Sequence, residues 1–125
     1  MAKASILVVD DDESILELLR LHLGNAGYEV RVASDAISAG YMVLAKPPDL
    51  IVCDVMMPHM DGFEFIAALK SDPTLPPIPV IFLTSMEEGE QRGREVGAIG
   101  YLTKPVLRDQ LLKLVAQHVP ADPLA

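Results

Sequence analysis

The fold of this chain is constrained most by short runs that are apolar at nearly every position. Three of them lie at residues 6–9, 50–53 and 80–83, and two further apolar runs lie at 29–33 and 100–103. Continuously apolar strands are typical of parallel sheets covered by helices on both faces. Amphipathic segments follow the runs, so the sequence predicts strands alternating with helices in one α/β domain.

The first predicted helix follows the run at 6–9 and ends before Gly27, which suits a left-handed residue after a helix. Its start matches either a capping box of Ser14 and Glu17 or a cap from Asp12. Its predicted inner stripe contains Ile15, Leu18, Leu19 and Leu23.

The other helices follow the same apolar pattern. The second is predicted to start at a cap from Ser34 and to reach about Leu44. The third and the fifth (107–119) are predicted to face inward with Phe63, Ile66 and Ala67, and with Leu111, Leu114 and Val115, respectively. The fourth is predicted at 87–96, where Gly89 and Gly93 each destabilise the helix by about 1 kcal/mol relative to Ala. We therefore expect it to switch easily between arrangements or to be partly disordered.

Right-handed crossovers between parallel strands give a doubly wound sheet, with the expected strand order 2-1-3-4-5. In this order the first and third strands are neighbours, and the chain changes direction across the sheet between them. Ligands of such sheets bind outside the carboxyl ends of the strands at that point. The topology therefore predicts a site where the first and third strands end.

Four of the apolar runs end on a chemically useful residue. Asp10 and Asp11 follow the first run, Asp54 the third, Thr84 the fourth and Lys104 the fifth. A single aspartate after a strand is commonly a turn residue or a helix cap. Four such endings in register instead predict an acidic pocket with a cation beside it.

Three carboxylates in one pocket repel one another, because two unit charges 4 Å apart cost roughly 4 kcal/mol at an effective dielectric constant of 20. Such a cluster calls for a cation, and hard oxygen ligands on a partly open site favour Mg²⁺ or Mn²⁺. Lys104 adds a fixed positive charge, and Thr84 adds a hydroxyl donor. Together these groups predict phosphoryl transfer to an aspartate.

Four motifs stand out together: Ile6 to Asp11, Asp54 to Gly62, Leu83-Thr84 and Tyr101 to Pro105. They resemble the motifs of the response-regulator receiver domains of two-component signalling, and the resemblance runs from Ser5 to about Val119. It implies a flavodoxin-like (βα)5 sandwich with a five-stranded parallel sheet. Residues 1–119 are then expected to form the receiver domain, and 120–125 a C-terminal tail or the start of a linker.

The resemblance implies a role for each residue of the pocket. Asp54 would accept the phosphoryl group from a phosphohistidine, and Thr84 and Lys104 would contact its oxygens. The ligands of Mg²⁺ would be Asp10, Asp11, Asp54 and the backbone carbonyl of Met56. The Lys104–Pro105 peptide bond would be cis.

The resemblance also implies a switch and its partners. Thr84 would move toward the phosphoryl group and Tyr101 would turn inward, which changes the surface of the helix at 87–96, the strand at 100–103 and the helix at 107–119. A histidine kinase or histidine phosphotransfer protein would supply the phosphoryl group. An output domain or partner protein would read the changed surface, with phosphorylation-dependent dimerisation as a further option.

Other functions stay open at this stage. A pseudo-receiver would bind proteins constitutively, without phosphorylation. A phosphatase with Asp54 as nucleophile is disfavoured, because Met56 stands where a second acid would be and the sequence shows no cap domain. Met56 and Met86, at the pocket mouth, offer no polar group to orient water. They predict a long-lived phosphoryl group, or else they are simply rim packing.

Composition narrows the location and the partners. The net charge of −8 and the pI near 4.7 disfavour direct binding to nucleic acid or to an anionic membrane. No apolar stretch approaches the ~18 residues of a membrane span. Met1 to Lys3 lead directly into a predicted strand rather than into a signal peptide. The single cysteine, Cys53, is expected to be a buried strand residue. We therefore expect a cytoplasmic protein.

Overall fold

The computed structural model describes residues 3–121 and contains a five-stranded parallel sheet. Its strands are β1 (Ser5–Val9), β2 (Glu29–Ala33), β3 (Leu50–Cys53), β4 (Val80–Thr84) and β5 (Gly100–Thr103). The strand order is β2-β1-β3-β4-β5, which confirms the predicted doubly wound, flavodoxin-like fold. β1 and β3 pair in register from Ile6 with Leu50 to Val9 with Cys53, so their carboxyl ends lie side by side.

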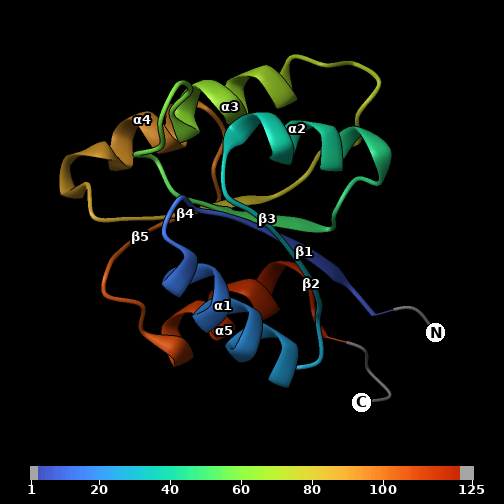
Figure 1. Cartoon of the computed structure of the whole chain (residues 1–125), viewed down its shortest axis with the longest axis vertical. Coiled ribbons are helices and arrows are strands. Elements are labelled where there is room, and N and C mark those ends of the chain that lie inside the picture. Colours follow the sequence, from blue (N-terminus) through green and yellow to red (C-terminus); the bar gives the residue numbers. More distant parts are fainter. Residues whose placement is uncertain (1–2, 122–125) are drawn as a thin grey trace.

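Helices cover both faces of the sheet (Figure 1). The upper layer in Figure 1 contains α2 (Ala36–Ala45), α3 (Gly62–Lys70) and α4 (Glu90–Glu95), and the lower layer contains α1 (Glu13–Asn25) and α5 (Arg108–His118). Successive strand residues point to opposite faces. Leu7, Ile51 and Phe82 therefore pack in the core under α2 and α3, whereas Ile6 and Val52 pack in the core over α1 and α5.

Aspartates, rather than serines, cap the first two helices. A carboxylate oxygen of Asp12 accepts a hydrogen bond from the Ser14 amide at 2.9 Å, and one of Asp35 accepts from the Ser38 amide at 2.7 Å. The predicted cap at Ser34 is therefore wrong, and Asp12 caps α1 in place of the capping box. A carboxylate is favoured here because it also carries negative charge next to the positive end of the helix dipole.

The inner stripes of α1 and α3 differ from the prediction. Leu18 is 37% exposed, and the residues that α1 buries are Leu16, Leu19 and Leu23. α3 buries Phe65 and leaves Ala67 exposed. Both versions of each stripe satisfy helical spacing, so the choice depends on how the helix sits on the sheet. In α3 the larger apolar side chain is buried.

The segment predicted as one helix at 87–96 is divided into two parts. A 3₁₀ helix, η1 (Glu87–Gly89), precedes α4, which has six residues. Gly89 and Gly93 are both buried there. A Cβ atom on Gly93 would lie 3.1 Å from the ring of Tyr101, and one on Gly89 would clash with the Tyr101 hydroxyl. The glycines therefore make room for a tyrosine in addition to weakening the helix.

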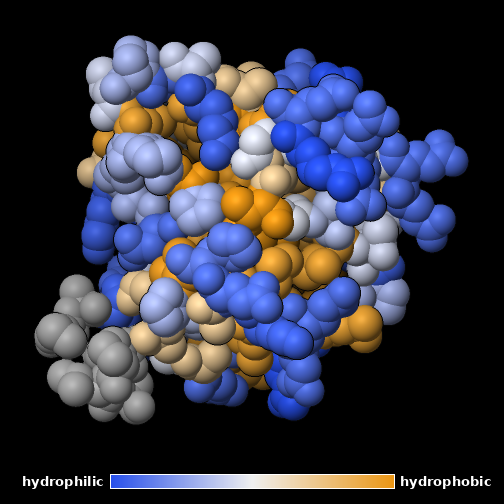
Figure 2. Space-filling view, turned by 180° about the vertical axis from the view of Figure 1, so that it is seen from behind, coloured by the Kyte–Doolittle hydropathy of each residue, from blue (hydrophilic) through white to orange (hydrophobic). Residues whose placement is uncertain are grey.

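The surface is mainly hydrophilic on the side opposite to the view of Figure 1, with hydrophobic residues in patches between the polar ones (Figure 2). Within residues 3–121, no helix has both the length and the apolar character needed to cross a membrane. Cys53 is fully buried, as predicted.

Candidate functional site

The three aspartates of the predicted pocket lie together at the carboxyl ends of β1 and β3. The Asp54 amide donates to the Val9 carbonyl at 2.9 Å, which extends the β1–β3 pairing to the site. Asp10, Asp11 and Asp54 each offer a carboxylate oxygen, and these oxygens lie within 4.8 Å of one another. Asp10 and Asp54 are buried, whereas Asp11 is exposed. The cluster is therefore open to solvent on the side of Asp11.

Lys104 bridges two of these carboxylates. Its Nζ atom lies 2.9 Å from Oδ2 of Asp10 and 3.1 Å from Oδ2 of Asp54. The Lys104 amide donates to the Thr84 carbonyl at 2.8 Å, which fixes the backbone of Lys104 beside the end of β4. The following peptide bond, to Pro105, is cis. The positive charge predicted beside the acidic pocket, the Lys104 ammonium, therefore contacts two of its carboxylates.

Burial and pairing act in opposite directions on the pKa values of Asp10 and Lys104. Burial raises the pKa of Asp10, although the Asp12 amide and Lys104 act to lower it. Burial alone would lower the pKa of Lys104, but its hydrogen bonds to Asp10 and Asp54 outweigh that effect and raise it. Lys104 is therefore charged at neutral pH, whereas burial makes the ionised form of Asp10 less favourable than it is in water.

The donor atoms at this cluster fit a hard divalent cation. All three side chains offer carboxylate oxygens, the ligands that Mg²⁺ and Mn²⁺ prefer. The oxygens of Asp10 already accept hydrogen bonds from the Asp12 amide and from Lys104, but a carboxylate oxygen can accept more than one partner. The exposed Asp11 leaves room for water ligands.

Met56 and Met86 each donate a backbone amide to a residue of the predicted pocket. The Met56 amide donates to Oδ1 of Asp54 at 3.2 Å, and the Met86 amide donates to Oγ1 of Thr84 at 3.2 Å. Thr84 is fully buried, while Met56 is 59% exposed and Met86 is 38% exposed. Both methionine side chains are therefore open to solvent, and their place at the mouth of the pocket stays a prediction.

Tyr101 is linked to the same loop. Its hydroxyl donates a hydrogen bond to the Met86 carbonyl. Its ring lies 6.2 Å from the ring of Phe82, and Phe82 in turn packs edge-on against Phe63 at 5.1 Å. The sequence pointed to Tyr101 but not to the packing of its ring with Phe82 and Phe63. These three residues come from different elements, and no sequence pattern shows that their rings are in contact.

Gly62 is a second residue that sequence reasoning missed. A Cβ atom at this position would clash with the backbone carbonyl oxygen of Asp54. The Gly62 amide also donates to the Val55 carbonyl at 2.8 Å. The start of α3 can therefore lie directly against the residue that follows β3. In the sequence, the pair Asp61-Gly62 signals only a turn.

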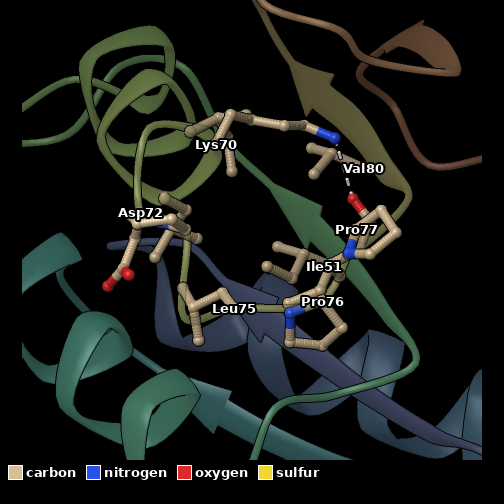
Figure 3. Close-up of a pocket in the computed structure, with 11 residues that line it drawn as sticks. Ile51, Lys70, Asp72, Leu75, Pro76, Pro77 and Val80 are labelled. Atoms are coloured by element: carbon tan, nitrogen blue, oxygen red, sulfur yellow. Dashed lines mark hydrogen bonds between the residues drawn. The ribbon is translucent and has the colours of Figure 1, made fainter.

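The cavity shown in Figure 3 lies away from this chemistry. It has a volume of about 280 Å³ and lies between the end of α3 and the proline-rich loop before β4. Figure 3 shows Lys70 reaching across it, and its ammonium donates to the Ile78 carbonyl at 3.0 Å. Val80, which lines the cavity, is the first residue of β4, and Thr84 is the last. The cavity therefore lies at the amino-terminal end of β4, and the acidic cluster lies at the carboxyl ends of the strands.

Comparisons with known proteins agree with the fold and the motifs. The family described as the response regulator receiver domain matches residues 6–116. The response regulator PleD of Caulobacter vibrioides is 46% identical over 105 residues, which are 82% of this chain but 23% of PleD. An uncharacterized 14.6 kDa protein of Leptolyngbya boryana is 42% identical over 125 residues, covering 98% of this chain and 95% of that protein.

A solved structure is also similar. The Vibrio cholerae chemotaxis protein CheY4 matches with a TM-score of 0.87 at 38% identity, covering 94% of this chain and all of that one. Receiver domains are signalling switches that typically use a divalent metal and work with histidine kinases or phosphotransfer proteins. With a family match over most of its length, this chain belongs to the response-regulator receiver domains of two-component systems.

Proposed function

We propose that this chain is a phosphorylatable switch, which accepts a phosphoryl group from a phosphohistidine onto Asp54 in a reaction that requires Mg²⁺ or Mn²⁺. The observation that carries the proposal is the contact of Lys104 with Asp54, at 3.1 Å, inside a cluster of three carboxylates. A carboxylate nucleophile next to a fixed cation and a set of hard oxygen ligands suits phosphoryl transfer better than it suits a structural role.

In the proposed reaction, an oxygen of Asp54 attacks phosphorus in line with the bond to the histidine nitrogen. The O–P bond of an acyl phosphate forms while the N–P bond breaks, and the departing imidazole keeps the electron pair and takes up a proton. The Met56 amide holds Oδ1 of Asp54, and Lys104 holds Oδ2, which orients the nucleophile. Lys104 and Thr84 then contact the phosphoryl oxygens.

The proposed metal ligands are the carboxylates of Asp10, Asp11 and Asp54 and the backbone carbonyl of Met56. A divalent cation bound there supplies positive charge for the oxygens of the transferred group. Asp10, through its contact with Lys104, also keeps that ammonium positioned between the two buried carboxylates. The protein residues thus bind, orient and neutralise, which is most of what phosphoryl transfer requires.

The backbone of Met86 supports a route from the site to the surface. Its amide donates to the Thr84 hydroxyl, and its carbonyl accepts from the Tyr101 hydroxyl. A phosphoryl group adds roughly 1.5 to 2 negative charges and attracts the Thr84 hydroxyl as a donor. That movement removes the acceptor of the Met86 amide and so disturbs the loop that holds Tyr101. We propose that the surface of α4, β5 and α5 changes in response, and that an output domain or partner protein binds there.

Several broader assignments belong to the same proposal. Residues 1–119 would be the receiver unit, with 120–125 as a tail or linker start. Of these, residues 1–2 and 122–125 lie outside the described residues. The donor would be a histidine kinase or histidine phosphotransfer protein in the cytoplasm. Phosphorylation could also bring two copies together through the α4-β5-α5 surface. With a net charge of −8, we propose no direct contact with nucleic acid or membrane.

Transfer from a phosphorylated histidine phosphotransfer domain tests this function. Label should move to the wild-type chain and to Asp61→Asn, which keeps a capping side chain on α3, but not to Asp54→Asn. If small phosphodonors and several such domains all fail to phosphorylate the folded wild-type chain with Mg²⁺, the constitutive pseudo-receiver is the better description.

A further inference from the structure

α2 is apolar on its outer face as well as on its inner face. Ile37, Tyr41 and Leu44 are 60%, 72% and 57% exposed, while Ala39 and Val43 on the opposite side are fully buried. The three exposed residues are spaced four and three apart, so they form one stripe along the helix. Residues 36–45 contain no charged side chain, in a chain of which 22% is charged. Apart from Ser38 and the Tyr41 hydroxyl, the helix is apolar on both faces, and such a helix is normally covered.

A groove runs beside this stripe, between α2 and α3. It has a volume of about 290 Å³ and is lined mainly by apolar residues of both helices, among them Phe65, Ala68 and Leu69, with Asp72 as a charged residue of the lining. Ile37, Tyr41 and Leu44 also line it, so the ridge and the groove form a single surface. A surface that carries both a ridge and the groove to receive it is self-complementary, which is what a twofold contact between identical chains requires.

The charges at the ends of α2 favour one arrangement of two copies. Asp35 caps the start of the helix and Lys46 follows its end. If two α2 helices pack antiparallel, Asp35 of each copy lies near Lys46 of the other, whereas parallel packing would bring like charges together. Lys46 forms only an exposed contact with Glu29, at 3.5 Å, so its ammonium is free to take a second partner.

The overall charge points to the same face. Each chain carries a net charge of −8, so two copies repel through most of their surfaces. The uncharged stretch at 36–45 lowers that repulsion at the contact, although Asp72 also lines the groove. We propose that α2 and the α2–α3 groove form a homodimer contact, in which the helices of two copies pack antiparallel about a twofold axis. This contact leaves the α4-β5-α5 surface free.

Sedimentation equilibrium of the full chain, up to about 1 mM protein, tests the surface. The wild type should self-associate, and Tyr41→Glu should lower the association constant about tenfold or more. Leu21→Glu is the matched control, because Leu21 is 56% exposed on α1 and lies outside the proposed contact. A monomeric wild type at all concentrations would overturn the proposal and leave the α2 face to a different protein. Equal weakening by both variants would overturn it as well.

Cross-linking of introduced cysteines with a short bis-maleimide tests the antiparallel geometry. The native Cys53 is buried and should not react with the reagent. Tyr41 lies near the middle of α2, so Tyr41→Cys should cross-link to itself. Ile37→Cys should cross-link to Leu44→Cys in a mixture more efficiently than to itself. Preferred cross-linking of Ile37→Cys to itself would contradict the antiparallel arrangement.

Discussion

Gly89 lies so close to Tyr101 that a Cβ atom on the glycine would clash with the tyrosine hydroxyl. The hydroxyl occupies this space because it donates a hydrogen bond to the carbonyl of Met86, which directly precedes the 3₁₀ helix that contains the glycine. From the sequence alone, the glycine indicated only a weak helix. In the structure it is a condition for the half-buried position of Tyr101 against the glycine.

Gly89→Ala should displace Tyr101 and break its hydrogen bond to Met86. We expect the free energy of unfolding to fall by about 1–3 kcal/mol, the usual effect of overpacking, with a shift of the Tyr101 ring resonances in NMR spectra. Gly24→Ala in α1 is the matched control, because a Cβ atom there meets nothing within 4 Å. That change should stabilise the protein by up to about 1 kcal/mol through helix propensity. If Gly89→Ala also stabilises the protein, helix propensity rather than space governs this glycine.

Asp10→Asn should stabilise the protein when divalent cations are chelated. Burial raises the pKa of Asp10, and a carboxyl group whose pKa is higher in the folded state contributes stability below its unfolded pKa and loses it as the pH rises through the folded value. At pH 7 the ionised Asp10 therefore lowers stability. In urea unfolding, the free energy of unfolding of Asp10→Asn should exceed that of the wild type by about 0.5–2 kcal/mol. This difference should become smaller as the pH is lowered. A less stable variant at pH 7 would mean that the contact with Lys104 outweighs burial.

Mg²⁺ should raise the thermal stability of the wild-type chain. A ligand at a hundredfold excess over its dissociation constant stabilises the folded state by about 2.7 kcal/mol, and a chelator should reverse the gain. Asp11→Asn should remove most of it. Asp12→Asn should retain it, because Asp12 is outside the cluster and an asparagine still caps α1. Equal gains for both variants would place the cation elsewhere.

Met86→Glu or Met56→Asn should shorten the lifetime of the acyl phosphate. The wild-type side chains are exposed and carry no polar group that could orient an attacking water. A polar group there should speed hydrolysis, by up to about 100-fold if it acts as a general base. The measurement is the loss of label from phosphorylated protein in excess unlabelled buffer. An unchanged rate for both variants would mean that the methionines are only rim packing.

The sheet and the meeting of Asp10, Asp54, Thr84 and Lys104 were predictable because parallel strands share one edge for all their carboxyl ends. One topological argument therefore placed residues from four strands at once. The roles of these residues are not decided by the fold, and they stay predictions.

Local choices were less predictable. Ser34 and Asp35 are both good caps, and the structure uses Asp35, whose oxygen reaches the Ser38 amide. Leu16 and Leu18 fit the same helical period, and packing on the sheet decides between them. The roles of Gly62 and Gly89 depend on atoms from distant segments, which no local pattern contains.

The central claim is tested most directly by the intact mass of the protein after incubation with Mg²⁺ and phosphoramidate, whose N–P bond stands in for that of phosphohistidine. The account predicts the mass of one added phosphoryl group on the wild-type chain. It predicts no adduct on Asp54→Asn, and none on the wild type when the metal is chelated. An adduct that persists in Asp54→Asn, or that forms equally without a divalent cation, would contradict the assignment of Asp54 and its acidic cluster as the phosphorylation site.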